Sequence, residues 1–250
     1  MFKLVKYELR ANFLTIVGIC VTVIIANLLL MTKKGTWDVA VPGLSACLTI
    51  GAIIVIFIAS LKIMSKYLYE DSGYLLFTLP QSGMSIMASR LVAALIQISF
   101  VVFVSVLMNY LTVTDKVSFS FFKEFKINQI IYYLISYIYM IISFLTIIYF
   151  CMIIGKVALK GKKLGKIGSF IIFIILSMVI SWLSVKITTL LPQTLNLSNF
   201  SLSSNDVLSS EFSVSGGALN INIASSIFDI FTFIGFFMLT SYLIDKKLDL

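Results

Sequence analysis

This chain of 250 residues contains few side chains that could catalyse a reaction or bind a metal. The sequence has no histidine, which removes imidazole acid–base catalysis and the usual zinc sites. The cysteines Cys20, Cys47 and Cys151 each lie within an apolar run, without the close spacing of a metal site. Glu70 and Asp71 are adjacent, but the other acidic residues are scattered, so no nucleophile, base and orienting group form a set. The sequence predicts neither an enzyme nor a metal centre.

Nucleotide hydrolysis requires a glycine-rich phosphate loop that ends in Lys followed by Ser or Thr. The closest stretch, Gly161–Gly168, has the wrong spacing and lacks the Ser or Thr. We therefore expect no cofactor bound by this chain, and any ATP and magnesium to be held by a partner ATPase.

The composition predicts a protein embedded in lipid. The chain is 60% hydrophobic and 12% charged, with a mean hydropathy of +1.06. A soluble fold of this composition would expose much apolar surface to water. A bilayer core needs about 20 apolar residues in helical form, and the sequence supplies six such runs, at residues 13–31, 44–65, 91–113, 129–155, 167–191 and 224–244. The expected fold is an all-α membrane protein, with residues 1–250 forming one transmembrane domain.

The basic residues predict the orientation of the spans. The net charge of +8 lies mainly in short segments between apolar runs, and the segment from Lys156 to Lys166 holds five lysines and no acid. By the positive-inside rule both termini are cytoplasmic. The expected location is the plasma membrane of a bacterial-type cell. Aromatic residues interleaved with a basic groove are missing from the sequence, so we expect no nucleic-acid partner.

Residues 1–12 have the pattern of a helix lying along the membrane surface. An apolar stripe bordered by basic side chains is formed by Phe2, Val5, Leu9 and Phe13 beside Lys3, Lys6 and Arg10. The alternative is a simple extension of the first span.

The largest segment outside the predicted spans is 192–223, which is rich in Ser and Asn. Phe212 and Val214 alternate with polar residues, and Gly216 and Gly217 can form the turn before the alternation resumes. We expect a small extracellular hairpin or cap, with a flexible loop as the alternative.

Polar residues inside the spans are candidate functional groups because a charge there is costly. Lys186 and Asp229 fall at similar depth and are expected to pair or to share a polar pocket, either as a clamp between helices or as a substrate contact. Gln97, Ser105 and Asn109 fall on one side of the third span, where they either line a pathway or hydrogen-bond to neighbouring helices. Aromatic residues that fit interfacial belts and helix packing are Tyr132, Tyr133, Tyr137, Tyr139, Trp37 and Trp182.

The connector at residues 66–90 is the most distinctive stretch. Its charged start, Gly73 and the turn from Pro80 to Gly83 predict a short helix, a break and re-entry into the third span. The connector offers an acidic and aromatic surface on an otherwise basic face, which suits docking of a partner protein. The alternative is a connector without a partner.

In these motifs the chain resembles the permease subunits of ABC-2-type transporters. The matching features are Lys6-Tyr7-Glu8-Leu9-Arg10 before the first span, then Glu70, Gly73, Leu79-Pro80, Ser82 and Arg90. The resemblance implies two permeases, a homodimer or a pair with a paralogue, each docked to a separate ABC ATPase through the connector. The expected ATPase-coupling residues are Tyr67, Tyr69, Glu70, Asp71, Gly73, Tyr74, Phe77 and Pro80, with Lys6 and Arg10 as a second contact.

The resemblance also implies alternating access driven by ATP binding to the partner. Small permeases of this layout are similar to those that export amphipathic or antimicrobial peptides, including lantibiotic and phenol-soluble modulin exporters. One alternative is an ABC exporter of hydrophobic drugs or lipids. Another is an ion-coupled secondary transporter, which would show internal repeats with broken spans. A third is a non-transporting membrane scaffold or sensor component.

Overall fold

The computed structural model describes residues 2–33, 37, 40–69, 82–113, 127–158, 165–196, 201–204, 212–215 and 218–247. Six of its helices are long and apolar enough to cross a membrane, as the sequence predicts. The chain divides into two compact units, Met1–Phe122 and Lys123–Leu250, and the single transmembrane domain expected over 1–250 stays a prediction. Hydropathy cannot reveal this division because each unit contributes three equally apolar helices.

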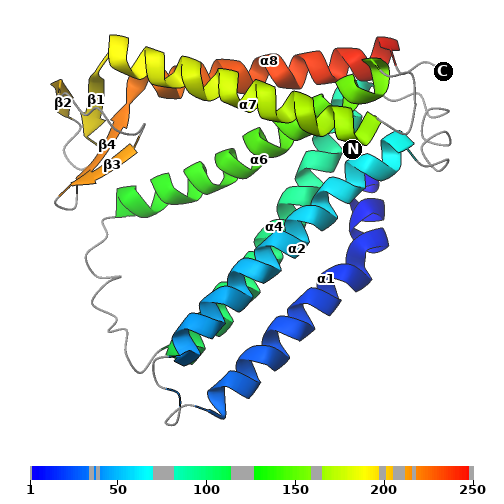
Figure 1. Cartoon of the computed structure of the whole chain (residues 1–250), viewed down its shortest axis with the longest axis vertical. Coiled ribbons are helices and arrows are strands. Elements are labelled where there is room, and N and C mark those ends of the chain that lie inside the picture. The colour runs from blue at the N-terminus through cyan, green and yellow to red at the C-terminus, as the bar shows by residue number, and fades with distance from the viewer. Residues whose placement is uncertain are drawn as a thin grey trace. The chain divides into compact units, whose positions relative to one another are not determined.

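Five of the six predicted spans each lie within one helix, and the fifth, 167–191, ends one residue beyond its helix (Figure 1). Unit 1 holds α1 (Phe2–Met31), α2 (Ala40–Tyr69) and α4 (Gly83–Val113), and unit 2 holds α6 (Ile127–Ala158), α7 (Gly165–Leu190) and α8 (Ile223–Lys247). Most helices extend beyond the apolar runs at their charged ends. Backbone hydrogen bonding continues past a lysine or arginine, whose long side chain can bend back toward polar surroundings.

The first helix includes the N-terminal stretch. Residues 2–12 are helical, as expected, but they are continuous with the first span in one helix, α1, from Phe2 to Met31. In Figure 1 the ribbon of α1 changes direction near its N-terminal end without a break. The stretch 2–12 contains neither Gly nor Pro, so nothing in it interrupts the helix. That residues 1–12 lie along the membrane surface stays a prediction.

The two ends of the connector belong to long helices. Residues 66–69 form the end of α2 rather than a short separate helix, and residues 70–81 lie outside the described part of the chain. The helix α4 begins at Gly83, where the carbonyl of Ser82 accepts hydrogen bonds from the backbone N–H groups of Ser85 and Ile86. Serine is a favoured residue just before a helix, which explains why α4 starts well before the predicted apolar run.

In unit 1, α4 packs against both α1 and α2. Its buried side chains include Met87, Ala93, Ala94 and Val101. Small residues such as the two alanines let helix backbones approach closely, which supports packing in lipid where the hydrophobic effect does not hold helices together. Since α1 and α2 also contact each other, the three helices form one packed group.

In unit 2, α6 contacts both α7 and α8. Aromatic rings lie at these contacts: the ring centroids of Phe150 and Phe236 are 4.8 Å apart. Phe144 and Phe173 meet edge to face with centroids 5.8 Å apart. Such pairs contribute about 0.5–1.5 kcal/mol beyond their buried area.

Unit 2 also carries a four-stranded antiparallel sheet between α7 and α8. The strands are β1 (Gln193–Asn196), β2 (Ser201–Ser204), β3 (Phe212–Ser215) and β4 (Ala218–Asn222), in the order β2-β1-β4-β3. The pairing of β3 with β4, with Ser215 opposite Ala218, is the one that the alternation around Gly216 and Gly217 predicts. The pair β1 and β2 was not predicted from the sequence.

One apolar residue from each strand falls at a matching register position. Leu202 pairs with Leu195, Leu195 with Ile221, and Ile221 with Phe212. The pairing of β1 with both β2 and β4 extends the predicted hairpin into a sheet.

Asn222 joins the sheet to the helices. Its Oδ1 accepts a hydrogen bond from the backbone N–H of Ser225 at 3.0 Å, which caps the start of α8. Its Nδ2 donates to the carbonyl of Leu191 at 2.9 Å, just after the end of α7. One buried side chain thus holds the end of α7 beside the start of α8.

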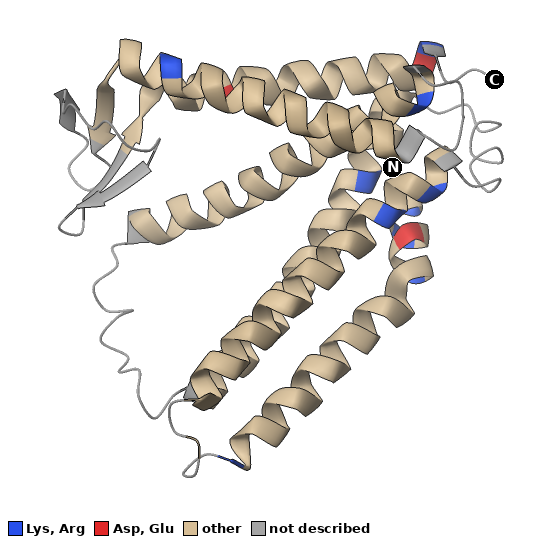
Figure 2. Cartoon of the chain, in the orientation of Figure 1, with Lys and Arg blue, Asp and Glu red and all other residues tan. Residues whose placement is uncertain are grey.

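Charged side chains concentrate at one end of each unit (Figure 2). In unit 1 this end carries the basic residues Lys3, Lys6, Arg10, Lys62, Lys66 and Arg90, whereas Lys33 lies at the other end of α1. In unit 2, Lys156 and Lys246 lie near the C-terminal ends of α6 and α8, and Lys186 lies near the C-terminal end of α7. Within each unit, the helices therefore place most basic groups of the described residues on one side.

Candidate functional site

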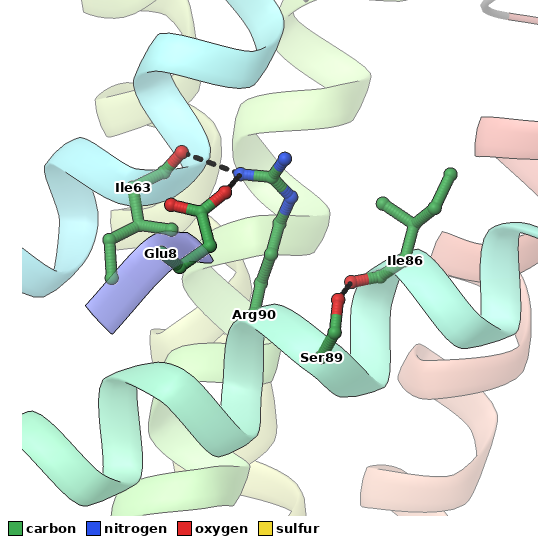
Figure 3. A network of polar contacts seen from close by, with 5 residues as sticks. All are labelled: Glu8, Ile63, Ile86, Ser89 and Arg90. Atoms are coloured by element: carbon green, nitrogen blue, oxygen red, sulfur yellow. Dashed lines mark hydrogen bonds and ion pairs between the residues drawn. The ribbon is translucent and has the colours of Figure 1, made fainter. Parts of the chain in front are cut away.

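A buried arginine joins the three helices of unit 1 at the base of the connector. In this Arg90 cluster, formed by Glu8, Ile63, Tyr67 and Arg90, Nη1 of Arg90 lies 3.2 Å from Oε1 of Glu8 on α1. The same nitrogen donates a hydrogen bond to the carbonyl of Ile63 on α2 at 2.9 Å. The guanidinium carbon lies 4.2 Å from the centre of the Tyr67 ring. Figure 3 shows the Arg90 side chain directed toward both oxygen acceptors.

The burial of Arg90 makes these contacts necessary. Its side chain is 4% exposed and that of Glu8 is 22% exposed. A guanidinium removed from water is destabilising unless a counter-charge and hydrogen-bond acceptors replace its hydration. Glu8, the Ile63 carbonyl and the Tyr67 ring provide a counter-charge, an acceptor and a cation–π surface. The ends of α1, α2 and α4 are therefore held together by one side chain.

Tyr67 has a structural place inside this cluster. Its side chain is 2% exposed, so it supports Arg90 from within the unit rather than presenting a surface to another protein. The hydroxyl of Ser89, next to Arg90, donates to the carbonyl of Ile86 at 2.8 Å and stays within its own helix. Arg90 is thus the residue of α4 that connects to both other helices here.

The other predicted coupling residues divide into three groups. Lys6 and Arg10 lie exposed on α1, where a partner can reach them. Tyr69 is the last residue of α2. The remaining six, Glu70, Asp71, Gly73, Tyr74, Phe77 and Pro80, lie outside the described residues.

A second polar network joins the same three helices at the opposite end of unit 1. Oδ1 of Asn27 on α1 accepts hydrogen bonds from the hydroxyls of Ser45 on α2 at 2.7 Å and Thr112 on α4 at 3.4 Å. Nearby, Nδ2 of Asn109 donates to the hydroxyl of Thr49 at 3.3 Å. Asn109 therefore hydrogen-bonds to a neighbouring helix. This Asn27 network (Asn27, Ser45, Thr49, Asn109 and Thr112) is neutral, in contrast to the charged Arg90 cluster.

Gln97 and Ser105 lie between these two ends on α4. Both are fully buried, and their side-chain polar atoms make no hydrogen bond to any described residue. Neither residue lines one of the two cavities described below. Their assignment to a substrate pathway stays a prediction.

The first cavity is an apolar groove of about 820 Å³ between α1 and α2. Small residues line it, including Gly18, Gly51 and the exposed Cys47, and a Cβ placed on either glycine would meet open space. The hydroxyl of Thr22 in this lining donates to its own helix, to the carbonyl of Gly18. The groove is suited to apolar contacts rather than to chemistry.

The second cavity lies within unit 2 and has about 530 Å³. Its polar and aromatic lining is made by residues of α6 and α8, which are Tyr132, Tyr133, Ser136, Tyr139, Ser143, Asp229, Thr232 and Phe233. Apolar side chains complete it, namely Met140 and Ile147 of α6 and Ile180 of α7. We call this cavity the Asp229 pocket. It gives Asp229 the polar surroundings that a carboxylate in an apolar helix requires.

Lys186 does not line the Asp229 pocket as far as the described residues show. It is exposed on α7, with Nζ 5.8 Å from the centre of the Trp182 ring. The predicted ion pair between Lys186 and Asp229 therefore stays a prediction. Three of the four tyrosines that the sequence suggested for interfacial belts or helix packing line the pocket, namely Tyr132, Tyr133 and Tyr139.

Sequence reasoning missed the Arg90–Glu8 pair, the Asn27 network and the tyrosines around Asp229. Glu8 and Arg90 both carry charge near predicted cytoplasmic ends of spans, which places them at similar depth but does not select them from the other charged residues there. The N-cap role of Asn222 had a readable signal, since asparagine precedes the last apolar run.

The fold and composition define a multi-pass helical membrane protein. Comparison with known proteins adds no narrower class, because no family model, no curated protein and no solved structure matches the chain.

Proposed function

We propose that this chain is the membrane-spanning permease subunit of an ATP-binding cassette exporter. In this proposal two permeases, identical or paralogous, each bind a separate ATPase through the connector between α2 and α4. ATP binding to the partner changes the separation of the ATPases, and the connector passes that movement to the spans. The cargo is an amphipathic or antimicrobial peptide, moved out through a bacterial-type plasma membrane by alternating access.

The observation that carries the proposal is the Arg90 cluster. A docking segment transmits force only if the helices on its two sides are fixed to one another at its base. Arg90 lies about two turns into α4, the helix at the C-terminal side of the connector. Its hydrogen bond to Ile63 reaches α2, the helix at the N-terminal side. The ion pair to Glu8 adds α1, whose exposed Lys6 and Arg10 lie two residues before and two residues after Glu8. This arrangement supports a rigid base for docking.

The distribution of charge supports the same orientation. The end of unit 1 that carries the connector is also the end that holds most of its described basic residues. Under the positive-inside rule that end faces the cytoplasm, where ATP and an ATPase are found.

The test is co-purification with an ATPase. The chain is co-expressed with the ATPase subunit of an ABC transporter from its own genome and purified through a tag on the chain. Replacing residues 70–79 with a Gly-Ser linker of equal length is expected to reduce the recovered ATPase about tenfold or more. The replacement removes the acidic and aromatic docking surface while the Arg90 cluster stays intact.

The matched control is the same kind of replacement at residues 205–211, in the predicted extracellular segment, which is expected to leave ATPase recovery unchanged. Size-exclusion chromatography of both variants checks that the chain still folds. Full ATPase recovery by the 70–79 variant would exclude the connector as the docking element.

A further inference from the structure

The Asp229 pocket is lined by groups that attract positive charge. Four of its residues are aromatic: Tyr132, Tyr133 and Tyr139 on α6, and Phe233 on α8. The rings of Tyr139 and Phe233 meet at 71° with centroids 6.0 Å apart. Those of Tyr132 and Tyr133 lie 6.2 Å apart at 60°. Rings held at steep angles present faces in several directions, and each face carries the negative part of the ring quadrupole.

The hydroxyl groups of the pocket add hydrogen-bond acceptors. The hydroxyl of Thr232 donates its proton to the carbonyl of Phe228 at 2.8 Å. That of Ser143 donates to the carbonyl of Met140 at 3.1 Å. A hydroxyl has one proton and two lone pairs, so both side chains have only lone pairs left for a ligand.

Asp229 gives the pocket its charge. An ionised carboxylate only accepts hydrogen bonds, and none of the eleven described residues that line the cavity is Lys or Arg. The lining therefore combines a carboxylate, oriented hydroxyl oxygens and aromatic faces.

The size and the apolar wall restrict the ligand further. The volume of about 530 Å³ is in the range of sites for small organic molecules, about 300–1,000 Å³. Met140, Ile147 and Ile180 form the apolar part of the wall, and methionine adapts to varied shapes. A metal ion would favour a shell of oxygen ligands, whereas aromatic faces with one carboxylate suit an alkylammonium group.

We propose that the Asp229 pocket binds an organic ammonium group that carries an apolar chain. The ammonium lies against the Asp229 carboxylate and the aromatic faces, and the chain lies along Met140, Ile147 and Ile180. The inference goes beyond the exporter proposal, because the site is within unit 2 and binding needs no ATPase. Two sources share this chemistry: a free hydrophobic cation, including the lysine side chain of a peptide, and the headgroup of a lipid.

The probe is radiolabelled dodecyltrimethylammonium, titrated below its micelle concentration onto the full chain in nanodiscs of phosphatidylglycerol, a lipid without an ammonium group. Saturable binding is expected, and Asp229→Asn is expected to weaken it about tenfold or more because the counter-charge is lost. The matched control is Asp245→Asn, an exposed aspartate near the other end of the same helix, which is expected to leave binding unchanged.

Two further measurements separate specific binding from simple partitioning into lipid. Phe233→Leu keeps an apolar side chain but removes a ring face, and is expected to weaken binding about threefold. The neutral analogue with carbon in place of nitrogen is expected to bind about tenfold or more weakly than the ammonium. Thermal unfolding of each variant confirms that the fold is kept, and Asp229→Glu retains most of the binding if the charge is what matters.

Adding phosphatidylcholine to the nanodiscs identifies the source of the ammonium. Competition with the probe assigns the site to lipid headgroups, and unchanged probe binding assigns it to free cations. Equal binding of the ammonium and its neutral analogue, or wild-type binding by a folded Asp229→Asn, would overturn the proposal. If the chain binds the probe but recovers no ATPase in the co-purification test, the proposal for the Asp229 pocket stands and the exporter proposal is excluded.

Discussion

The two units solve the problem of packing helices in lipid with different side chains. In unit 1, polar groups connect all three helices at both ends, through the Arg90 cluster and the Asn27 network. In unit 2, α6 meets α7 and α8 through aromatic rings, and Asn222 joins the end of α7 to the start of α8. Apolar side chains gain little from leaving lipid for a helix interface, so directional contacts decide how helices align.

This difference suggests different roles for the units. Directional bonds at both ends of unit 1 hold the ends of its three helices at fixed positions relative to one another. The proposed docking of an ATPase at the connector requires such a rigid support. Aromatic contacts tolerate small shifts of the rings and enclose a pocket, which suits unit 2 for binding a ligand. The comparison can be tested by removing one contact of each kind.

The largest effect is expected from Glu8→Leu in unit 1. The change leaves Arg90 buried without its counter-charge, and breaking one side of a buried ion pair costs about 3 kcal/mol. The free energy of unfolding, measured in mixed detergent micelles, is expected to fall by that amount. Replacing both partners, with Glu8→Leu and Arg90→Met together, is expected to recover most of the loss because no unpaired charge remains.

The control for this experiment is Lys6→Gln, which removes an exposed charge from the same helix and is expected to change stability by less than about 0.5 kcal/mol. A Glu8→Leu variant as stable as the control would show that the ion pair does not hold the helices of unit 1 together.

A smaller effect is expected from Phe236→Leu in unit 2. The substitution keeps an apolar side chain of similar size and removes the ring that contacts Phe150 at 4.8 Å, so a loss of about 1 kcal/mol is expected. Phe231→Leu is the matched control, because Phe231 is 70% exposed on the same helix. Equal stabilities of the two variants, measured by the same unfolding assay, would remove the aromatic contact from the account of unit 2.

The spans and one strand pair could be predicted from the sequence alone. Length and hydropathy predict each helix, since nothing but a helix satisfies the backbone of a 20-residue apolar run in lipid. The alternation on both sides of Gly216 and Gly217 predicts the pairing of β3 with β4. These are local signals, and the residues that carry them are close in the chain.

The site residues were less predictable because they depend on how each helix is rotated. Glu8 and Arg90 meet only because α1 and α4 turn those faces toward each other, and no periodicity links residues so far apart. The same holds for Tyr139 and Phe233 beside Asp229. Asn109 was recognised as polar from the sequence, but its partner Thr49 required the packing of α2 against α4.

The central claim is that the end of unit 1 carrying the connector faces the cytoplasm, where an ATPase can bind it. Labelling of single cysteines tests this claim most directly, in a chain whose Cys20, Cys47 and Cys151 are replaced by serine. A membrane-impermeant maleimide is expected to miss Lys6→Cys in intact cells and to modify it once the membrane is opened. It is expected to modify Gln193→Cys, at the start of β1, in intact cells. Modification of Lys6→Cys in intact cells would contradict the account.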